Sequence, residues 1–134
     1  MEREILFRAK HIHAMDSNEY LNGRWVHGYL SDKNYINDKS LEGEFLVDEN
    51  TICQYTGLID KNGKKIFEGD ILRHADETIL KTVWNDRKYG FAAQCVKGSV
   101  LLKDCKWGLW EFESDEVEVI GNVFDNPELL GGTK

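Results

Sequence analysis

The stretch Gln54 to Leu72, QYTGLIDKNGKKIFEGDIL, contains the strongest turn signal in the chain and decides how the chain folds. Its centre, Asp60 to Gly63 (DKNG), lies between two short β-prone runs. Turn residues in this order between apolar runs are typical of a β-hairpin. We therefore predict a hairpin over Leu58 to Phe67.

Two registers of this hairpin compete. An Asn62-Gly63 type I′ loop places Lys61 opposite Lys64, a like-charge pair that costs about a few tenths of a kcal/mol. A type I turn that starts at Asp60 and closes with a left-handed Gly63 as a G1 bulge places Asp60 opposite Lys64 instead. We prefer the bulged register, and the sequence leaves the other one open.

The same loop does not fit a calcium site of the EF-hand type. Counted from Asp60, the fifth, sixth and twelfth positions are Lys64, Lys65 and Ile71. The EF-hand needs an acid or Asn, a Gly and a Glu there. Calcium binding by that mechanism is excluded.

Short β-prone runs continue on both sides of the hairpin. Glu4 to His13 and Arg24 to Leu30 alternate like strands, and the polar segment Ser31 to Gly43 is typical of a loop or a short hairpin. The best helix candidates, Asp16 to Leu21 and Pro127 to Leu130, are each about one turn long. A mainly β fold, all-β to α+β, is expected.

Composition and charge narrow the class of protein. A chain of 134 residues can bury one real core, so a single domain is expected. The formal net charge of −7 opposes non-specific attraction to phosphates.

Cys53, Cys95 and Cys105 have no CxxC spacing, which indicates reduced, partly buried thiols. Without a signal-peptide or membrane-length apolar run, the cytosol is the expected location.

Four parts of the chain carry a family resemblance: Gln54 to Leu72, Arg3 to Ala9 (REILFRA), Val83-Trp84 with Gly90-Phe91, and Val119 to Leu130 (VIGNVFDNPELL). Together they resemble the YopX family of proteins encoded by phages and prophages. It implies a protein of the host bacterial cytosol with a mainly β fold: a small SH3-like barrel, an N-terminal β layer and a short C-terminal helical turn. It implies no reaction.

On this resemblance we expect one YopX-like domain over residues 1–134. The SH3-like barrel is expected within residues 52–124, and residues 1–51 are expected to supply the N-terminal strand layer and loops.

The sequence lacks the usual anchors of an enzyme. It has no GxSxG elbow, no phosphate-binding GxxxxGK[ST], no GxGxxG and no HExxH, so we predict no catalytic residue and no cofactor. His11 and His13 share a strand face, but no further ligand is tied to them by spacing, and we predict solvated or edge-strand histidines rather than a metal site. Glu68 and Asp70 flank Gly69, and we predict that Asp70 is a turn residue whose carboxylate accepts backbone N–H groups. A second acidic cluster, formed by Asp115, Glu116 and Glu118, is predicted to be a solvated strand edge.

One candidate binding surface combines bases and aromatic rings. Lys97, Lys103 and Lys106 lie near Trp107 and Trp110, a combination that binds single strands by stacking. Tryptophans in such a run more often complete a core, and the net charge opposes phosphate binding.

The function expected from these observations is that of a non-enzymatic phage accessory protein. Its expected partner is an unidentified phage or host protein, with no membrane partner. A nucleic-acid-binding small β-barrel is the first alternative and an uncharacterised enzyme the second. The sequence leaves a homo-oligomer open.

Overall fold

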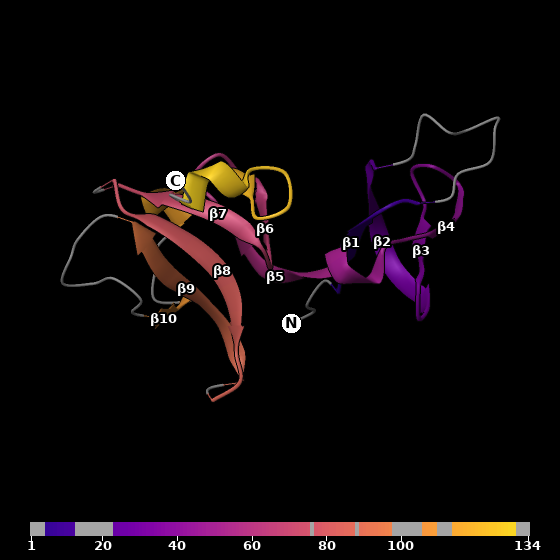
Figure 1. The fold of residues 1–134 in the computed structure, drawn as a ribbon, viewed down its shortest axis with the longest axis horizontal. Coiled ribbons are helices and arrows are strands. Elements are labelled where there is room, and N and C mark those ends of the chain that lie inside the picture. Colours follow the sequence, from indigo (N-terminus) through magenta and orange to yellow (C-terminus); the bar gives the residue numbers. More distant parts are fainter. Residues whose placement is uncertain are drawn as a thin grey trace. The chain divides into compact units, whose positions relative to one another are not determined.

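The computed structural model describes residues 5–12, 23–75, 77–87, 89–97, 106–109 and 114–130; for Lys97, Lys106 and Trp107 it describes the backbone alone. The described chain is mainly β, which confirms the expected fold class (Figure 1). It divides into two compact units, Met1–Tyr55 and Thr56–Lys134. The single domain expected over residues 1–134 stays a prediction.

The first unit is an antiparallel meander. Its strands follow the order β4-β3-β2-β1, and β1 also pairs with the start of β5. A 3-10 helix, η2, separates β4 from β5. The bounds are β1 (Phe7–Lys10), β2 (Trp25–Asp32), β3 (Tyr35–Asp38), β4 (Gly43–Leu46), η2 (Glu49–Thr51) and β5 (Cys53–Ile59). Because β2 and β3 pair, the short-hairpin alternative for residues 31–43 is confirmed.

The end of this meander returns to its first strand. Val47, just after β4, forms a β-bridge with His11, just after β1. The N–H of Asp48 donates to the carbonyl of Lys10 at 2.9 Å. The chain from β4 to β5 therefore runs along β1 on both sides of η2.

Strand alternation gives the first unit its core. Ala9, Val26, Ile36 and Val47 are buried together, and the partly buried residues packed against them are Phe7, Phe45 and Ile52. In β1 and β2, Ala9 lies opposite Val26, so their side chains share one face.

The second unit is built on a five-stranded antiparallel sheet in the order β10-β9-β8-β7-β11. The bounds are β6 (Lys65–Phe67), β7 (Asp70–His74), β8 (Ile79–Asn85), β9 (Gly90–Lys97), β10 (Lys106–Gly108), η5 (Ser114–Glu116), β11 (Val117–Asn122) and η6 (Pro127–Leu130). The 3-10 helix η6 confirms the predicted C-terminal helical turn. The other helix candidate, Asp16 to Leu21, lies outside the described residues.

This sheet has two separate edges, β10 and β11. Among the described residues no pairing joins them into a closed barrel, so the SH3-like barrel expected over residues 52–124 is not confirmed. Strand runs can be recognised from local pattern, but the pairing of distant edges depends on contacts that local pattern does not contain.

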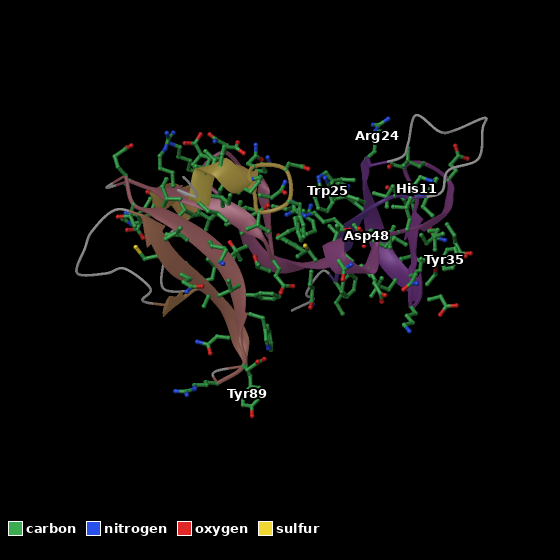
Figure 2. The ribbon with its side chains drawn as sticks, in the orientation of Figure 1. His11, Arg24, Trp25, Tyr35, Asp48 and Tyr89 are labelled. Carbon is green, nitrogen blue, oxygen red and sulfur yellow. The ribbon has the colours of Figure 1, made fainter. Side chains whose placement is uncertain are left out.

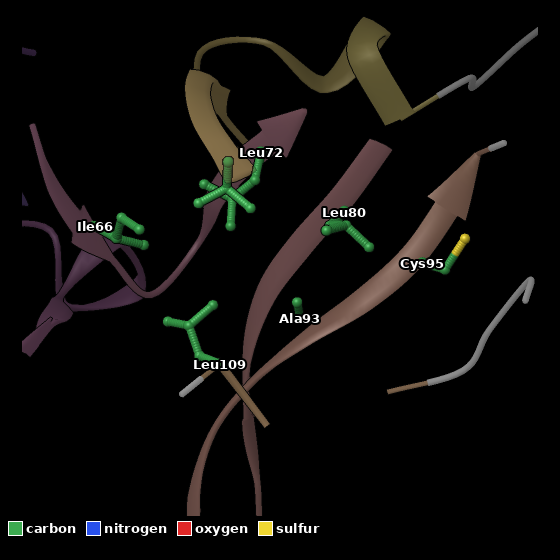
Figure 3. Packing of buried hydrophobic residues seen from close by; sticks show 7 residues of the cluster. Ile66, Leu72, Leu80, Ala93, Cys95 and Leu109 are labelled. Carbon is green, nitrogen blue, oxygen red and sulfur yellow. The ribbon is translucent and has the colours of Figure 1, made fainter. Parts of the chain in front are cut away.

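The core of the second unit lies on one face of the sheet (Figure 3). It consists of the buried residues Ile66, Leu72, Leu80, Ala93, Cys95, Leu109 and Val117. Leu80 of β8 lies opposite Cys95 of β9. Cys53 and Cys95 are buried thiols, as predicted; Cys105 lies outside the described residues.

The hairpin between β5 and β6 has the bulged register. Gly63 has a φ of +79°, and its N–H donates to the carbonyl of Asp60 at 3.0 Å. The N–H of Asp60 donates to the carbonyl of Lys64 at 2.8 Å. Since Asp60 pairs with Lys64, the preferred prediction is confirmed.

Within the part of the chain that the structure describes, no helix has the length and apolar character needed to span a membrane.

Candidate functional site

A groove of about 390 Å³ lies on the first unit. Its lining comes from Ile5 and Leu6 before β1, from His27 to Tyr29 of β2, and from Asn37 to Ser40 at the end of β3. This volume is within the range of about 300–1,000 Å³ that small-molecule and peptide side-chain pockets occupy. The groove is therefore large enough to accept a ligand group.

Gly28 allows two strands to approach closely at this groove. A Cβ atom at Gly28 would lie 1.8 Å from the carbonyl oxygen of Asn37, which is a backbone atom. The clash would be with the backbone of a paired strand, which cannot move away as a flexible side chain could. The shape of the groove therefore requires glycine at this position.

The carboxylate of Asp38 holds the end of β3 in place. The residue is buried, and its side chain accepts hydrogen bonds from the N–H of His27 (2.9 Å), the N–H of Ser40 (2.9 Å) and the hydroxyl of Ser40 (2.6 Å). Burial opposes ionisation, but these hydrogen bonds outweigh it and lower the pKa of Asp38. The carboxylate is thus ionised and engaged near neutral pH, which suits an anchor rather than an acid-base group.

His27 contributes a neutral wall to the groove. Partial desolvation lowers the pKa of His27, although the residue as a whole is exposed. The positive charge of Arg8 lowers this pKa further, whereas the negative charge of Asp38 raises it. A histidine whose pKa lies below its usual value is uncharged at neutral pH.

The rim of the groove is apolar. Ile5 is 64% exposed and Tyr29 is 49% exposed. A fold gains nothing from leaving side chains of this size in water, whereas a bound partner would bury them. The groove therefore combines a neutral wall, a fixed backbone and an apolar rim.

Acidic side chains near η5 are paired with basic side chains. Glu118 lies 2.7 Å from Arg73 and 3.7 Å from Lys61, and His74 lies 3.6 Å from Glu116. The hydrogen bond from Arg73 lowers the pKa of Glu118 most, and desolvation opposes it. These residues line a cavity of about 240 Å³ with mixed charge. The prediction of a solvated strand edge agrees with the partial exposure of Glu118 on edge strand β11.

The prediction for His11 is wrong. His11 is buried, its Nδ1 lies 2.7 Å from the carbonyl oxygen of Leu46, and its ring meets the edge of Phe45 at 5.1 Å. The reason is that the end of β4 returns to cover the end of β1. His13 lies outside the described residues, and within those residues no three His, Cys, Asp or Glu side chains group to hold a metal ion.

The predicted basic and aromatic surface remains a prediction. Lys106 and Trp107 lie on β10 and pair with Gln94 and Ala93 of β9, while Lys97 ends β9. Their side chains are not described, and Lys103 and Trp110 lie outside the described residues.

Sequence reasoning missed the groove. Its one visible signal is Gly28, which interrupts the β-prone run Arg24 to Leu30 (RWVHGYL). An isolated glycine within a strand often marks a close backbone approach.

Comparison with known proteins identifies the family and a fold relative. No curated protein matches the chain. The crystal structure of protein EF1440 from Enterococcus faecalis matches with 24% sequence identity and a TM-score of 0.53, covering 96% of this chain and 99% of that chain. This likeness concerns the fold alone. The family model of the YopX protein matches residues 6–131, nearly the whole chain, and the chain therefore belongs to the YopX family.

Proposed function

We propose that this chain is a non-enzymatic phage or prophage accessory protein of the bacterial cytosol, which acts by binding a phage or host protein. The binding site is the groove of the first unit. The observation that carries the proposal is the exposure of Ile5 and Tyr29 at the rim of a groove whose backbone is fixed by Asp38.

The chemistry of the groove favours a protein ligand over a reaction. Its carboxylate, that of Asp38, is occupied by three hydrogen bonds, and His27 is neutral. Apolar side chains beside a preformed polar backbone suit an extended peptide, whose side chains enter the groove while its backbone stays near the strand ends.

Charge argues against nucleic acid as the ligand of this groove. Of the described residues that line the groove, Lys39 alone is a lysine or arginine, and the acidic Asp38 precedes it in the sequence. Phosphate binding requires several cations that replace released counterions.

We further propose, as the family resemblance implies, that a small SH3-like barrel lies within residues 52–124. Support comes from the five-stranded antiparallel sheet β10-β9-β8-β7-β11, which carries its own buried core. Barrels of this kind present loops and exposed strand faces for recognition.

The test uses two exposed tyrosines on neighbouring strands. Tyr29 lines the groove, whereas Tyr35 of β3 is 40% exposed and is not among the lining residues. Tagged wild-type protein, Tyr29→Ala and Tyr35→Ala are used to capture partners from phage-infected host cells, from lysate with and without nuclease treatment. We expect wild type and Tyr35→Ala to retain the same protein, and Tyr29→Ala to lose at least tenfold of it.

Two results would reject the proposal. Capture that disappears after nuclease treatment would make the ligand a nucleic acid. Equal capture by Tyr29→Ala and Tyr35→Ala would exclude the groove as the binding site.

A further inference from the structure

The far end of the β8–β9 hairpin is a feature that the groove does not involve. β8 pairs with β7 through Ile79 to Lys81 only, and β10 pairs with β9 through Ala92 to Gln94. Figure 1 shows the two strands of the hairpin continuing beyond β7. The distal part of the hairpin is therefore a two-stranded ribbon.

The apolar face of this ribbon continues past the core. Leu80 and Thr82 are buried, and strand alternation places Trp84 on the same face of β8. Trp84 is nevertheless 43% exposed. It lies opposite Phe91, and their rings meet edge to face at 5.2 Å. Since Phe91 packs against the core, it holds one side of Trp84 and leaves the rest in water.

Tyr89 stands at the tip of the hairpin and points away from it (Figure 2). It is 83% exposed, and its φ of +51° is a conformation that bulky residues rarely adopt. Glycine would take this position without strain. The needs of the fold therefore do not account for a tyrosine here.

The tip is preorganised in spite of its exposure. Asn85 lies opposite Gly90, and its Oδ1 accepts a 3.0 Å hydrogen bond from the N–H of Arg87. A turn whose backbone is already ordered loses less conformational entropy on binding.

We propose that Trp84, Arg87 and Tyr89 form a docking knob that inserts into an apolar pocket with a carboxylate at its rim, on a partner protein. These are the three residue types most enriched among binding hot spots. An aromatic side chain buries about 150–250 Å². Two of them together therefore bury well below the roughly 800 Å² per partner of a standard interface. A pocket that encloses the knob is therefore the better match than a flat surface.

Charge selects a protein rather than a nucleic acid. The chain carries a net charge of −7, and in the sequence Arg87 lies between Asp86 and Lys88, so these three residues carry a formal net charge of +1. Phosphate binding requires several cations along the strand. One exposed guanidinium matches one carboxylate. The knob and the groove have no residue in common, so each proposal is tested by its own variants.

The experiment places a photoactivatable phenylalanine analogue at Tyr89 in the full chain, expressed in phage-infected host cells. The matched control carries the same analogue at Tyr35, an exposed tyrosine of the first unit. Adducts are treated with nuclease, and the cross-linked peptide is mapped by mass spectrometry. The identified protein is then purified, and its Kd for the unmodified chain is compared with its Kd for Trp84→Ala, Arg87→Glu and Tyr89→Gly.

We expect a nuclease-resistant adduct with one protein from position 89 and not from position 35. Each variant should weaken binding at least tenfold, and Tyr89→Gly should do so with an unchanged or higher melting temperature because it relieves the strained φ. Tyr35→Ala, at an exposed tyrosine outside both the groove and the knob, should leave this Kd unchanged.

Four outcomes would overturn the knob. They are no adduct above the Tyr35 control, an adduct with nucleic acid, an adduct only with a second copy of this chain, and a Kd that Tyr89→Gly and Trp84→Ala leave unchanged.

Discussion

The side chain of Asp60 joins the β5–β6 turn to a strand much later in the chain, because its Oδ2 accepts a 2.9 Å hydrogen bond from the N–H of Val119. Its Oδ1 accepts hydrogen bonds from the N–H groups of Asn62 (2.9 Å) and Lys64 (2.8 Å). One buried carboxylate thus orders the bulged turn and fixes it against β11. We therefore predict that this part of the family motif is scaffold.

Replacing Asp60 with Ala should therefore destabilise the second unit. The change leaves the N–H of Val119 without its acceptor, and a loss of about 1–3 kcal/mol in the free energy of unfolding is expected. Asp60→Asn keeps one acceptor oxygen and should lose less. Urea denaturation measures both, with the exposed Asp115→Ala as a control that should change stability by less than about 0.5 kcal/mol. An unchanged midpoint for Asp60→Ala would contradict this role.

The same carboxylate predicts a pH dependence. Burial raises the pKa of Asp60, but the hydrogen bonds from Val119, Lys64 and Asn62 outweigh it and hold the pKa below its usual value. A depressed pKa in the folded state stabilises the protein above the unfolded pKa of about 3.9, and this stabilisation is lost as pH falls through the folded value. The stability difference between wild type and Asp60→Asn should be constant above about pH 5 and shrink below about pH 3.9. Denaturation curves from pH 7 to pH 2 test this; a constant difference throughout would refute it.

The sequence predicted the bulged hairpin because the turn chemistry is local. Asp at the first position and Gly at the fourth are enough to select a register over Asp60 to Lys64. The contact between Asp60 and Val119 was not predictable, since no pattern links residues 59 positions apart. The backbone-binding role of Asp70 was predicted for the same local reason, as its Oδ2 accepts the N–H of Phe67 at 2.8 Å.

The candidate sites were harder to predict. The groove depends on how β2 and β3 approach each other at Gly28, and the knob depends on where the core ends along β8. Alternation alone assigns Trp84 to the buried face with Leu80 and Thr82, and only the pairing of the strands reveals its exposure. His11 was misjudged for the converse reason, because a strand from later in the chain covers it.

Gly63 should tolerate few replacements. Its φ is +79°, but a Cβ there would meet no heavy atom within 4 Å, so the cost of a substitution arises from the backbone alone. Gly63→Val should lose about 1–3 kcal/mol of unfolding free energy. Gly63→Asn should lose less, because asparagine enters the left-handed region more easily. Thermal melts of the two variants test the order; equal melts would mean that the turn does not need a left-handed residue.

Thr82 should tolerate loss of its hydroxyl. The side chain is buried, and among the described residues its Oγ1 has no hydrogen-bond partner. Burying an unpaired hydroxyl costs about 1–3 kcal/mol, so Thr82→Val should leave the free energy of unfolding unchanged or raise it. Thr82→Ala, which also removes the methyl group, should lower it by creating a cavity. A loss of more than about 1 kcal/mol in Thr82→Val would indicate that the hydroxyl has a partner.

Asp70 tests whether the end of the motif is scaffold as well. The residue is 1% exposed, and its carboxylate accepts the N–H of Phe67 just before the turn at Gly69. Asp70→Ala should therefore lose about 1–3 kcal/mol, which lowers the melting temperature of a chain of this size by several degrees. Asp70→Asn, which keeps an acceptor oxygen, should lose less. A binding site would behave in the opposite way, since sites often sacrifice stability: the Ala variant would melt unchanged or higher and lose its partner. Thermal melts beside partner capture decide between them, and a stable Asp70→Ala protein that no longer captures its partner would reject the scaffold role.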